Sequence, residues 1–272
     1  MNSKLRMLTA PFRVFPDFII LGEAKCGTTS LYRYLNQLPV ILGADVKEPN
    51  NFREYGGSPL FCKQHFPTYA TLAYHQARHG AVRVGEASAE YFSKPNLPKT
   101  IHGLLPDVRL ICLFRDPVKR AYSDWQMLTR ANREHRPFEE IVDHSLTFLS
   151  NPDHEVVLEA LDHLEYHPLR YVARGLYHRA LIRWMNTFSP DRILCLLSED
   201  LFSDPADTLQ RVTAFLGVQA ECDSLEFSPR KQGNYDSPCP ESCKQELAAF
   251  YKPWNQKLSD ATDLDLPWKL DA

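Results

Sequence analysis

The sequence predicts an α/β fold with three layers, in which a central parallel sheet is flanked by helices on both faces. Four short apolar runs recur along the chain, and helical stretches separate them. The runs span residues 17–22, 81–85, 109–114 and 192–197. Strands that alternate with helices pair in parallel and are buried on both faces, which explains the continuous apolar runs. The chain of 272 residues has no repeats and no low-complexity linker, so we expect a single domain, residues 1–272.

The loop after the first apolar run has the features of an anion-binding turn. Gly22 and Gly27 bracket this loop, and residues 28–37 carry apolar side chains at helical spacing. A helix that starts after a glycine turn presents N–H groups and the positive end of its dipole to an anion. Similar glycine turns also occur without a function. We predict a P-loop-like phosphate site here, formed by Lys25, Cys26, Gly27, Thr28, Thr29 and Ser30.

The position of the lysine separates this loop from that of a nucleotide kinase. The ordinary nucleotide loop reads G-x-x-x-x-G-K-[ST], with the lysine directly after the second glycine. Thr28 occupies that position here, and the lysine is Lys25, inside the loop. A P-loop kinase or NTPase is therefore the less favoured alternative, which magnesium-dependent ATP turnover would support.

Residues 43–70 are rich in proline and aromatic residues, and we expect a loop with a short helix there. The third apolar run, 109–114, is followed by Arg115, by Pro117 at an early helical position, and by Ser123 about two helical turns later. The forked donors of an arginine suit a phosphate, although Arg115 could also be a structural residue of the turn.

The second half of the chain gives fewer signals. Residues 130–170 predict helices and a mobile lid, and the histidines that gather there are expected to be solvated or packed. A helix is predicted over 202–216, ending at Gly217, which is typical of a helix C-terminus. Residues 256–272 are expected to form a loosely packed tail.

Two of these segments together resemble the sulfotransferases that use 3′-phosphoadenosine 5′-phosphosulfate (PAPS). The G-x-x-K-x-G-T-T loop from Gly22 resembles the family's 5′-phosphosulfate loop. The R-D-P-x-x-R-A-x-S segment from Arg115 to Ser123 resembles its 3′-phosphate motif. The resemblance covers roughly residues 15 to 255 and implies that Arg115 and Ser123 hold the 3′-phosphate.

A third segment, residues 86–92, resembles the E-K-[ST]-x-x-Y-F stretch of the heparan-sulfate-type branch. The resemblance implies that Glu86 is the catalytic base and that Lys25 stabilises charge on the leaving phosphate oxygen. It also implies further cofactor-binding residues in an R-G-L-Y patch and in a basic loop that closes over the cofactor. These residues are Tyr177, Arg230, Lys231 and Gly233.

The sequence departs from this branch on the side of the acceptor. Ala87 stands where the branch has a lysine, and Asn50 replaces the histidine of a K-E-x-H-F-F stretch. We expect Glu48, Asn50 and Glu90 to face the acceptor. These departures leave the identity of the acceptor undetermined, whereas they do not affect the prediction of the cofactor.

The distribution of charge bears on the acceptor. Residues 1–136 hold 19 Lys and Arg against 11 Asp and Glu, and residues 137–272 hold 12 against 23. The acidic half argues against nucleic acid and against a long polyanionic acceptor. We therefore expect sulfuryl transfer from PAPS, without a metal, to a hydroxyl or amine of a small neutral or cationic metabolite, such as a natural product. The product would be 3′-phosphoadenosine 5′-phosphate (PAP). A carbohydrate O- or N-sulfotransferase and an inactive sulfotransferase-like binding module remain alternatives.

No apolar run reaches the roughly 18–20 residues of a membrane span. Charged residues and prolines interrupt the N-terminal segment, so we expect no signal peptide and no membrane contact. A cytoplasmic protein, monomeric or homodimeric, is the expectation. The sequence leaves open whether Cys239 and Cys243 form a disulfide.

Overall fold

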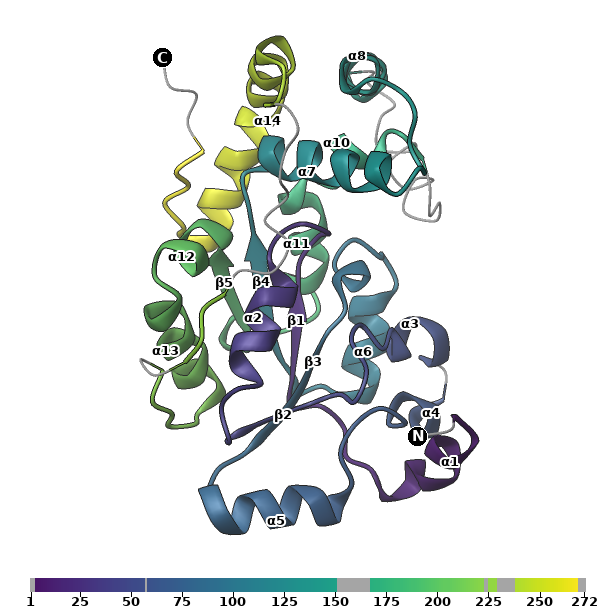
Figure 1. Cartoon of the computed structure of the whole chain (residues 1–272), viewed down its shortest axis with the longest axis vertical. Coiled ribbons are helices and arrows are strands. Elements are labelled where there is room, and N and C mark those ends of the chain that lie inside the picture. The colour runs from purple at the N-terminus through teal and green to yellow at the C-terminus, as the bar shows by residue number, and fades with distance from the viewer. Residues whose placement is uncertain (1–2, 57, 151–166, 223–224, 229–237, 269–272) are drawn as a thin grey trace.

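The computed structural model describes residues 3–56, 58–150, 167–222, 225–228 and 238–268, and its centre is a parallel sheet (Figure 1). Five strands form this sheet in the order β2-β3-β1-β4-β5, and every pair is parallel. The predicted fold is therefore confirmed. The strands are β1 (Phe18–Leu21), β2 (Ile41–Gly43), β3 (Arg83–Ala87), β4 (Arg109–Phe114) and β5 (Ile193–Leu197).

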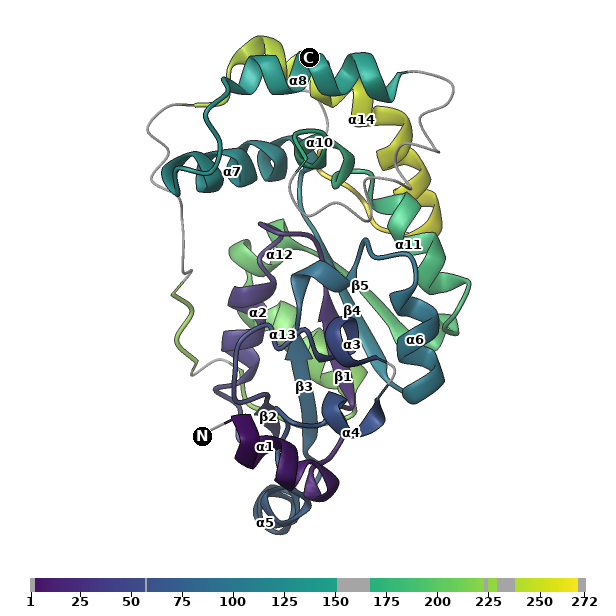
Figure 2. The ribbon, with the colours of Figure 1, turned by 90° about the vertical axis from the view of Figure 1, so that its right-hand side faces the viewer.

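Helices cover both faces of the sheet, and a further group of helices lies above its carboxyl edge (Figures 1 and 2). The α-helices are α1 (Ser3–Thr9), α2 (Thr28–Leu35), α3 (Asn51–Tyr55), α4 (Pro59–Cys62), α5 (Tyr69–His79), α6 (Leu97–Leu104), α7 (Pro117–Arg130), α8 (Phe138–Leu149), α10 (Arg170–Ala173), α11 (Tyr177–Met185), α12 (Ser198–Ser203), α13 (Pro205–Leu216) and α14 (Glu241–Thr262). Short 3₁₀ turns are η1 (Ala10–Phe12), η2 (Ala89–Tyr91) and η3 (Pro190–Arg192).

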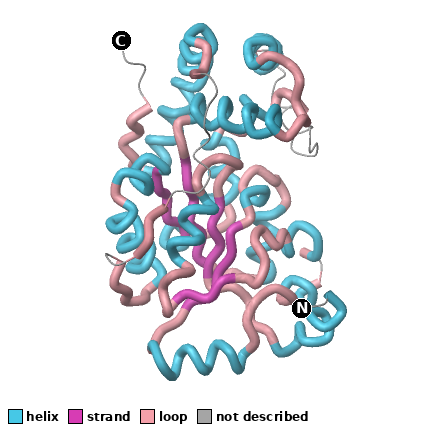
Figure 3. Tube along the Cα trace, in the orientation of Figure 1, coloured by secondary structure: helices cyan, strands magenta, loops and turns pink. Residues whose placement is uncertain are grey.

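Alternate residues of the strands feed two separate cores, because successive side chains point to opposite faces of a sheet. On one face Ile19 packs with buried residues of α6 and α11, including Trp184. On the other face Ile20 packs with α2, α12 and α13, including Leu31. A third core joins α7, α8, α10 and α14 above the sheet. Figure 3 shows the strands enclosed between these helices.

The topology brings three loops to one place. Strand β1 lies between β3 and β4, with Ile20 opposite both Ala87 and Ile111. The chain leaves β1 toward β2 and β3 on one side and later reaches β4 and β5 on the other. Ligands of open α/β sheets bind outside the carboxyl ends of the strands at such a switch point. The loops after β1, β3 and β4 meet there.

Three local expectations need correction. Strand β2, with a glycine among its three residues, was not predicted. The predicted helix 202–216 is divided into α12 and α13, because Asp204 accepts a hydrogen bond from the Asp207 N–H, at 3.0 Å, and starts a new helix. The tail expected from residue 256 is wrong, since α14 continues to Thr262 and buries Leu258 completely.

Candidate active site

The loop after β1 adopts a conformation that needs its glycines. Lys25 has a φ of 75° and Gly27 a φ of 87°, both left-handed. A Cβ at Gly22 would lie 2.7 Å from the Leu113 carbonyl oxygen, so only glycine fits between β1 and β4. Gly27 precedes α2, whose first turn has no side-chain cap. The N–H groups of Thr28 and Thr29 at the start of that turn can therefore serve an anionic ligand, whereas the Ser30 N–H donates to the Gly27 carbonyl oxygen at 2.9 Å.

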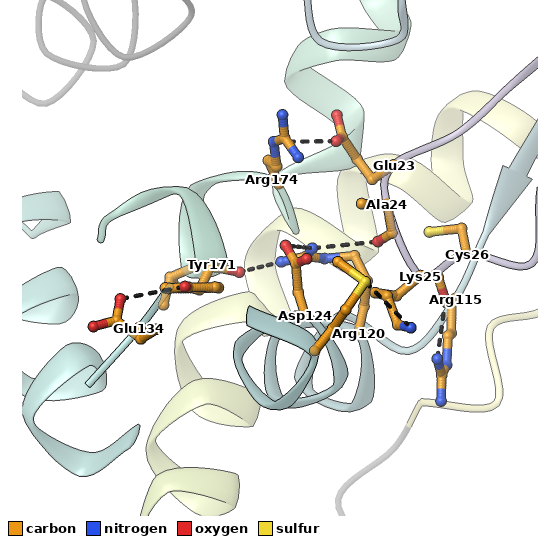
Figure 4. A network of polar contacts seen from close by, with 12 residues as sticks. Glu23, Ala24, Lys25, Cys26, Arg115, Arg120, Asp124, Glu134, Tyr171 and Arg174 are labelled. Carbon is orange, nitrogen blue, oxygen red and sulfur yellow. Dashed lines mark hydrogen bonds and ion pairs between the residues drawn. The ribbon is translucent and has the colours of Figure 1, made fainter. Parts of the chain in front are cut away.

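Four of the residues predicted to bind the cofactor are in contact with one another. Arg115 Nη1 donates to the Lys25 carbonyl oxygen at 2.9 Å (Figure 4). The Tyr177 hydroxyl donates to the Arg115 carbonyl oxygen at 2.8 Å and lies 3.5 Å from Cys26 Sγ. Lys25 Nζ lies 3.9 Å from the sulfur of Met127 on α7. The loops after β1 and β4 thus form one unit.

The remaining predicted cofactor residues fall into two groups. Ser123 is buried on α7, and Thr28, Thr29 and Ser30 form the first turn of α2. Arg230, Lys231 and Gly233 lie outside the described residues. Arg115 follows β4 and Ser123 lies on α7, and their shared role at a 3′-phosphate stays a prediction of the sequence.

Glu86 lies on β3, opposite Ile19 of β1, and its side chain is completely buried. The Ser88 hydroxyl donates to Glu86 Oε2 at 2.6 Å, and Glu86 Oε1 is buried without a hydrogen-bond partner. Burial raises the pKa of Glu86 to about 7, although hydrogen bonds from Ser88 and Tyr91 oppose the shift. A carboxyl group with this pKa can exchange a proton near neutral pH.

The raised pKa of Glu86 predicts a pH-dependent stability. The folded pKa of about 7 exceeds the ordinary value of 4.5, so the stabilisation is complete below about pH 4.5 and is lost as the pH rises through 7. We expect Glu86→Gln to remove up to about 3 kcal/mol of this dependence. Denaturant unfolding of both proteins at about pH 5 and pH 7.5 measures it. Equal pH dependence in the two proteins would contradict the assignment.

The acceptor-side residues Glu48 and Asn50 share a strained loop. Both have a φ of 50°, a left-handed conformation that is rare for residues other than glycine. The Asn50 N–H donates to Ser88 Oγ at 3.3 Å, and Asn50 Nδ2 donates to the Glu48 carbonyl oxygen at 3.2 Å. Ser88 therefore joins this loop to the Glu86 carboxyl group. The Glu48 side chain is 37% exposed and pairs with Lys47.

The third acceptor-side residue, Glu90, lies in η2 and forms an ion pair with Arg53 of α3. Its side chain is 39% exposed. The loop that carries Glu48 and Asn50 and the turn that carries Glu90 thus lie near the carboxyl end of β3. Each of the three residues has a polar partner.

Two buried charged groups of the site were not predicted from the sequence. Arg120 is fully buried and donates to the carbonyl oxygens of Ala24 and Tyr171, and it pairs with Asp124 at 3.2 Å (Figure 4). Glu23 is also buried and lies 3.5 Å from Arg174 Nε. Arg120 is the second arginine of the R-D-P-x-x-R pattern, which is the feature of the sequence that could have identified it. The burial of Arg120 depends on packing from α10 and α14, which the pattern does not indicate.

Other features of the described residues concern metals, membranes and thiols. Within them, no three His, Cys, Asp or Glu side chains gather as metal ligands would. None of the described helices combines the length and apolarity needed to cross a bilayer. Cys239 and Cys243 are both free thiols.

Comparison with known proteins decides the family. The family model described as "Sulfotransferase domain" matches residues 15–236. The chain belongs to the sulfotransferase family. This sulfotransferase is 27% identical, over 310 residues, to human "Carbohydrate sulfotransferase 15", and the alignment covers 94% of the chain and 55% of the relative. It is 27% identical to mouse "Heparan sulfate glucosamine 3-O-sulfotransferase 6", covering 94% of the chain and 74% of the relative.

A solved structure agrees with the sequence comparisons. The sulfotransferase resembles the "Sulfotransferase from Alicyclobacillus acidocaldarius" with a TM-score of 0.68 and 28% identity. That likeness covers 93% of this chain and 98% of the other. The sulfotransferase spans about half the length of carbohydrate sulfotransferase 15. The activity and the acceptor of that longer protein are therefore not assigned to this chain.

Proposed function

We propose that the chain transfers a sulfuryl group from PAPS to a hydroxyl or amine of an acceptor. One observation carries this proposal: the Lys25 loop follows β1, and the buried Glu86 lies on the neighbouring strand β3, opposite Ile19 of β1. A cationic loop and a proton-accepting carboxyl group at one switch point are the two groups that such a transfer requires. Membership of the sulfotransferase family supports the same reaction.

Each residue of the loops has a distinct task in this proposal. The first turn of α2 binds the 5′ end of the cofactor, while Arg115 and Ser123 hold the 3′-phosphate and select PAPS over ATP. PAPS supplies the sulfuryl group and leaves as PAP. Lys25 stabilises the negative charge that develops on the leaving phosphate oxygen, since a donor fixed in advance costs no reorganisation during the reaction.

Two carboxylates can take the proton of the acceptor. Glu86 is the proposed base. Its pKa of about 7 lets a substantial fraction of the carboxyl groups be ionised near neutral pH, and the ionised group still binds a proton more strongly than an ordinary carboxylate does. Its complete burial requires the adjoining loop to open for the acceptor. Glu48 is the second candidate, because its partly exposed side chain lies on the strained loop that Ser88 links to Glu86.

The class of acceptor is a further part of the proposal. The acidic second half of the sequence favours a small neutral or cationic metabolite. A carbohydrate acceptor is supported by the names of the relatives, which include a carbohydrate sulfotransferase and a heparan sulfate glucosamine 3-O-sulfotransferase. A cytoplasmic location, a single domain and a monomeric or homodimeric state stay predictions of the sequence.

An acceptor screen tests the proposed function. The protein is incubated with PAPS and a panel of saccharides and small hydroxyl or amine compounds, with and without EDTA. Mass spectrometry then detects an acceptor that has gained one SO₃. Transfer that survives EDTA supports the proposal, including its independence of metal. Magnesium-dependent ATP turnover without sulfuryl transfer would instead favour the kinase alternative.

We expect the protein to bind PAP far more tightly than AMP, because only PAP has a 3′-phosphate for Arg115 and Ser123. Arg115→Ala should remove this preference, since a hydrogen bond to a charged group contributes about 1.5–3 kcal/mol. Calorimetry with the two nucleotides measures it. Lys99→Ala, at an exposed position of α6, is the matched control. Equal affinity of the unaltered protein for PAP and AMP would contradict the assignment of Arg115.

A further inference from the structure

Two consecutive residues that follow β5 contact both of the loops predicted to bind the cofactor. The buried Ser198 hydroxyl donates a hydrogen bond to the Cys26 carbonyl oxygen, in the loop after β1. Glu199 Oε1 accepts a hydrogen bond from the Asp116 N–H at 2.9 Å, in the turn after β4. We call Ser198 and Glu199 the α12 bridge, since they are the first two residues of that helix.

The register of the sheet explains why one segment reaches both loops. Strands β4 and β5 are parallel, and their last residues, Phe114 and Leu197, lie opposite each other. The chain therefore leaves the two strands at the same height, and Glu199 meets the turn that begins with Arg115. Strand β4 separates β1 from β5, so the hydrogen bond from Ser198 spans the carboxyl end of β4.

Helix α12 supports the Lys25 loop at a second point. A Cβ added at Gly27 would lie 3.2 Å from the Phe202 ring, so this ring of α12 packs directly on the Gly27 backbone. Leu201 of the same helix packs with Leu31 of α2 in one buried core. The contact between Ser198 and the loop is therefore part of a packed interface.

Ser198 holds the third of three consecutive carbonyl oxygens in the Lys25 loop. The first two accept hydrogen bonds from Arg120 at 3.5 Å and from Arg115 at 2.9 Å (Figure 4). Because a peptide unit is planar, a donor that fixes the Cys26 carbonyl also fixes the direction of the Gly27 N–H, at the start of α2. A loop that is fixed before its ligand arrives loses less conformational freedom on binding.

We propose that Ser198 and Glu199 are positioning residues, which fix the spacing between the site for the 5′ end and the site for the 3′-phosphate of one nucleotide. The inference rests on the proposed function, which assigns the 5′ end to the α2 turn and the 3′-phosphate to Arg115 and Ser123. Ser198 acts through the Lys25 loop, and Glu199 acts through the backbone beside Arg115. Neither side chain touches the nucleotide in this proposal.

Only a nucleotide that fills both sites depends on their spacing. PAP has a phosphate at each end, whereas AMP has only the 5′-phosphate and 3′-AMP only the 3′-phosphate. Once one phosphate of PAP is bound, fixed loops present the second site to the other phosphate at a high effective concentration. Loss of the α12 bridge should therefore weaken the binding of PAP more than that of either monophosphate.

The test measures the affinity of the full chain for PAP, AMP and 3′-AMP by calorimetry. Ser198→Ala and Glu199→Ala each remove one contact of the bridge. Glu199→Gln is the conservative variant, since its amide oxygen can still accept the Asp116 N–H. Glu246→Ala removes an acid from an exposed position of α14 and is the matched control. The thermal unfolding midpoint of each protein shows whether the fold persists.

We expect Ser198→Ala and Glu199→Ala to weaken the binding of PAP about tenfold, the effect of one lost hydrogen bond, and that of each monophosphate by less than about threefold. Glu199→Gln and the control should bind PAP within about threefold of the unaltered protein.

Unchanged binding of PAP in both alanine variants would overturn the inference. Equal weakening of all three nucleotides would overturn it as well, because general damage to the fold lowers every affinity alike. A loss in Glu199→Gln as large as in Glu199→Ala would assign the effect of Glu199 to its charge and remove it from the bridge. Equal affinity of the unaltered protein for PAP and AMP contradicts the proposed function itself, and the inference falls with it.

Discussion

Lys25→Met is expected to lower the turnover number by a factor of about 10²–10³, the usual effect of removing one fixed donor from a developing oxyanion. Methionine keeps the unbranched side chain, so the loss is one of charge rather than of volume. The backbone of Lys25 is already left-handed, at a φ of 75°, and methionine meets the same strain as lysine. Single-turnover measurements with PAPS and the acceptor found in the screen determine the rate.

The rate should fall much more than the affinity for PAP. Lys25 acts in the proposal on charge that forms during transfer, whereas the α2 turn, Arg115 and Ser123 also bind the product. Lys99→Met is the matched control, since Lys99 is exposed on α6. Turnover of Lys25→Met within about threefold of the unaltered protein would remove Lys25 from the mechanism. The site would then resemble a plain anion-binding turn.

The central elements of the fold follow from the sequence for a simple physical reason. Parallel strands are buried on both faces, so their apolar runs are continuous and stand out, as in the run that ends at Phe114. Strand β2 has only three residues, and its apolar run Val40-Ile41-Leu42 is short and lies between Pro39 and Gly43, residues that are typical of turns. Its pairing with β3 comes from the tertiary structure. Helix α14 was missed beyond residue 255 because Pro253 and the polar residues that follow resemble a helix end and a tail.

The sequence predicts the parts of the site whose residues lie in one segment. It does not predict the parts whose residues come from segments that only the fold brings together. Lys25 and the α2 turn belong to one segment, so their residue types and spacing indicate anion binding. The proximity of Glu86 to that loop depends on the order of the strands, which the apolar runs alone do not specify.

Glu86→Gln is expected to lower turnover by a factor of about 10²–10⁴, the contribution typical of a general base. The amide has the shape of the carboxyl group and can still accept the hydrogen bond from Ser88, so folding and the affinity for PAP should persist. Glu90→Gln is the control, because Glu90 pairs with Arg53 at the surface. A milder loss is expected there.

The pH profile of turnover distinguishes Glu86 from Glu48. If Glu86 is the base, turnover should rise with pH through about 7, since the group must be ionised to accept the proton. A large loss of turnover in Glu48→Gln, with near-normal turnover in Glu86→Gln, would assign the base to Glu48. Glu86 would then position the base through Ser88, which accepts the Asn50 N–H and donates to Glu86 Oε2. In that arrangement Ser88→Ala should lower turnover as well, because the strained loop that carries Glu48 loses its link to β3.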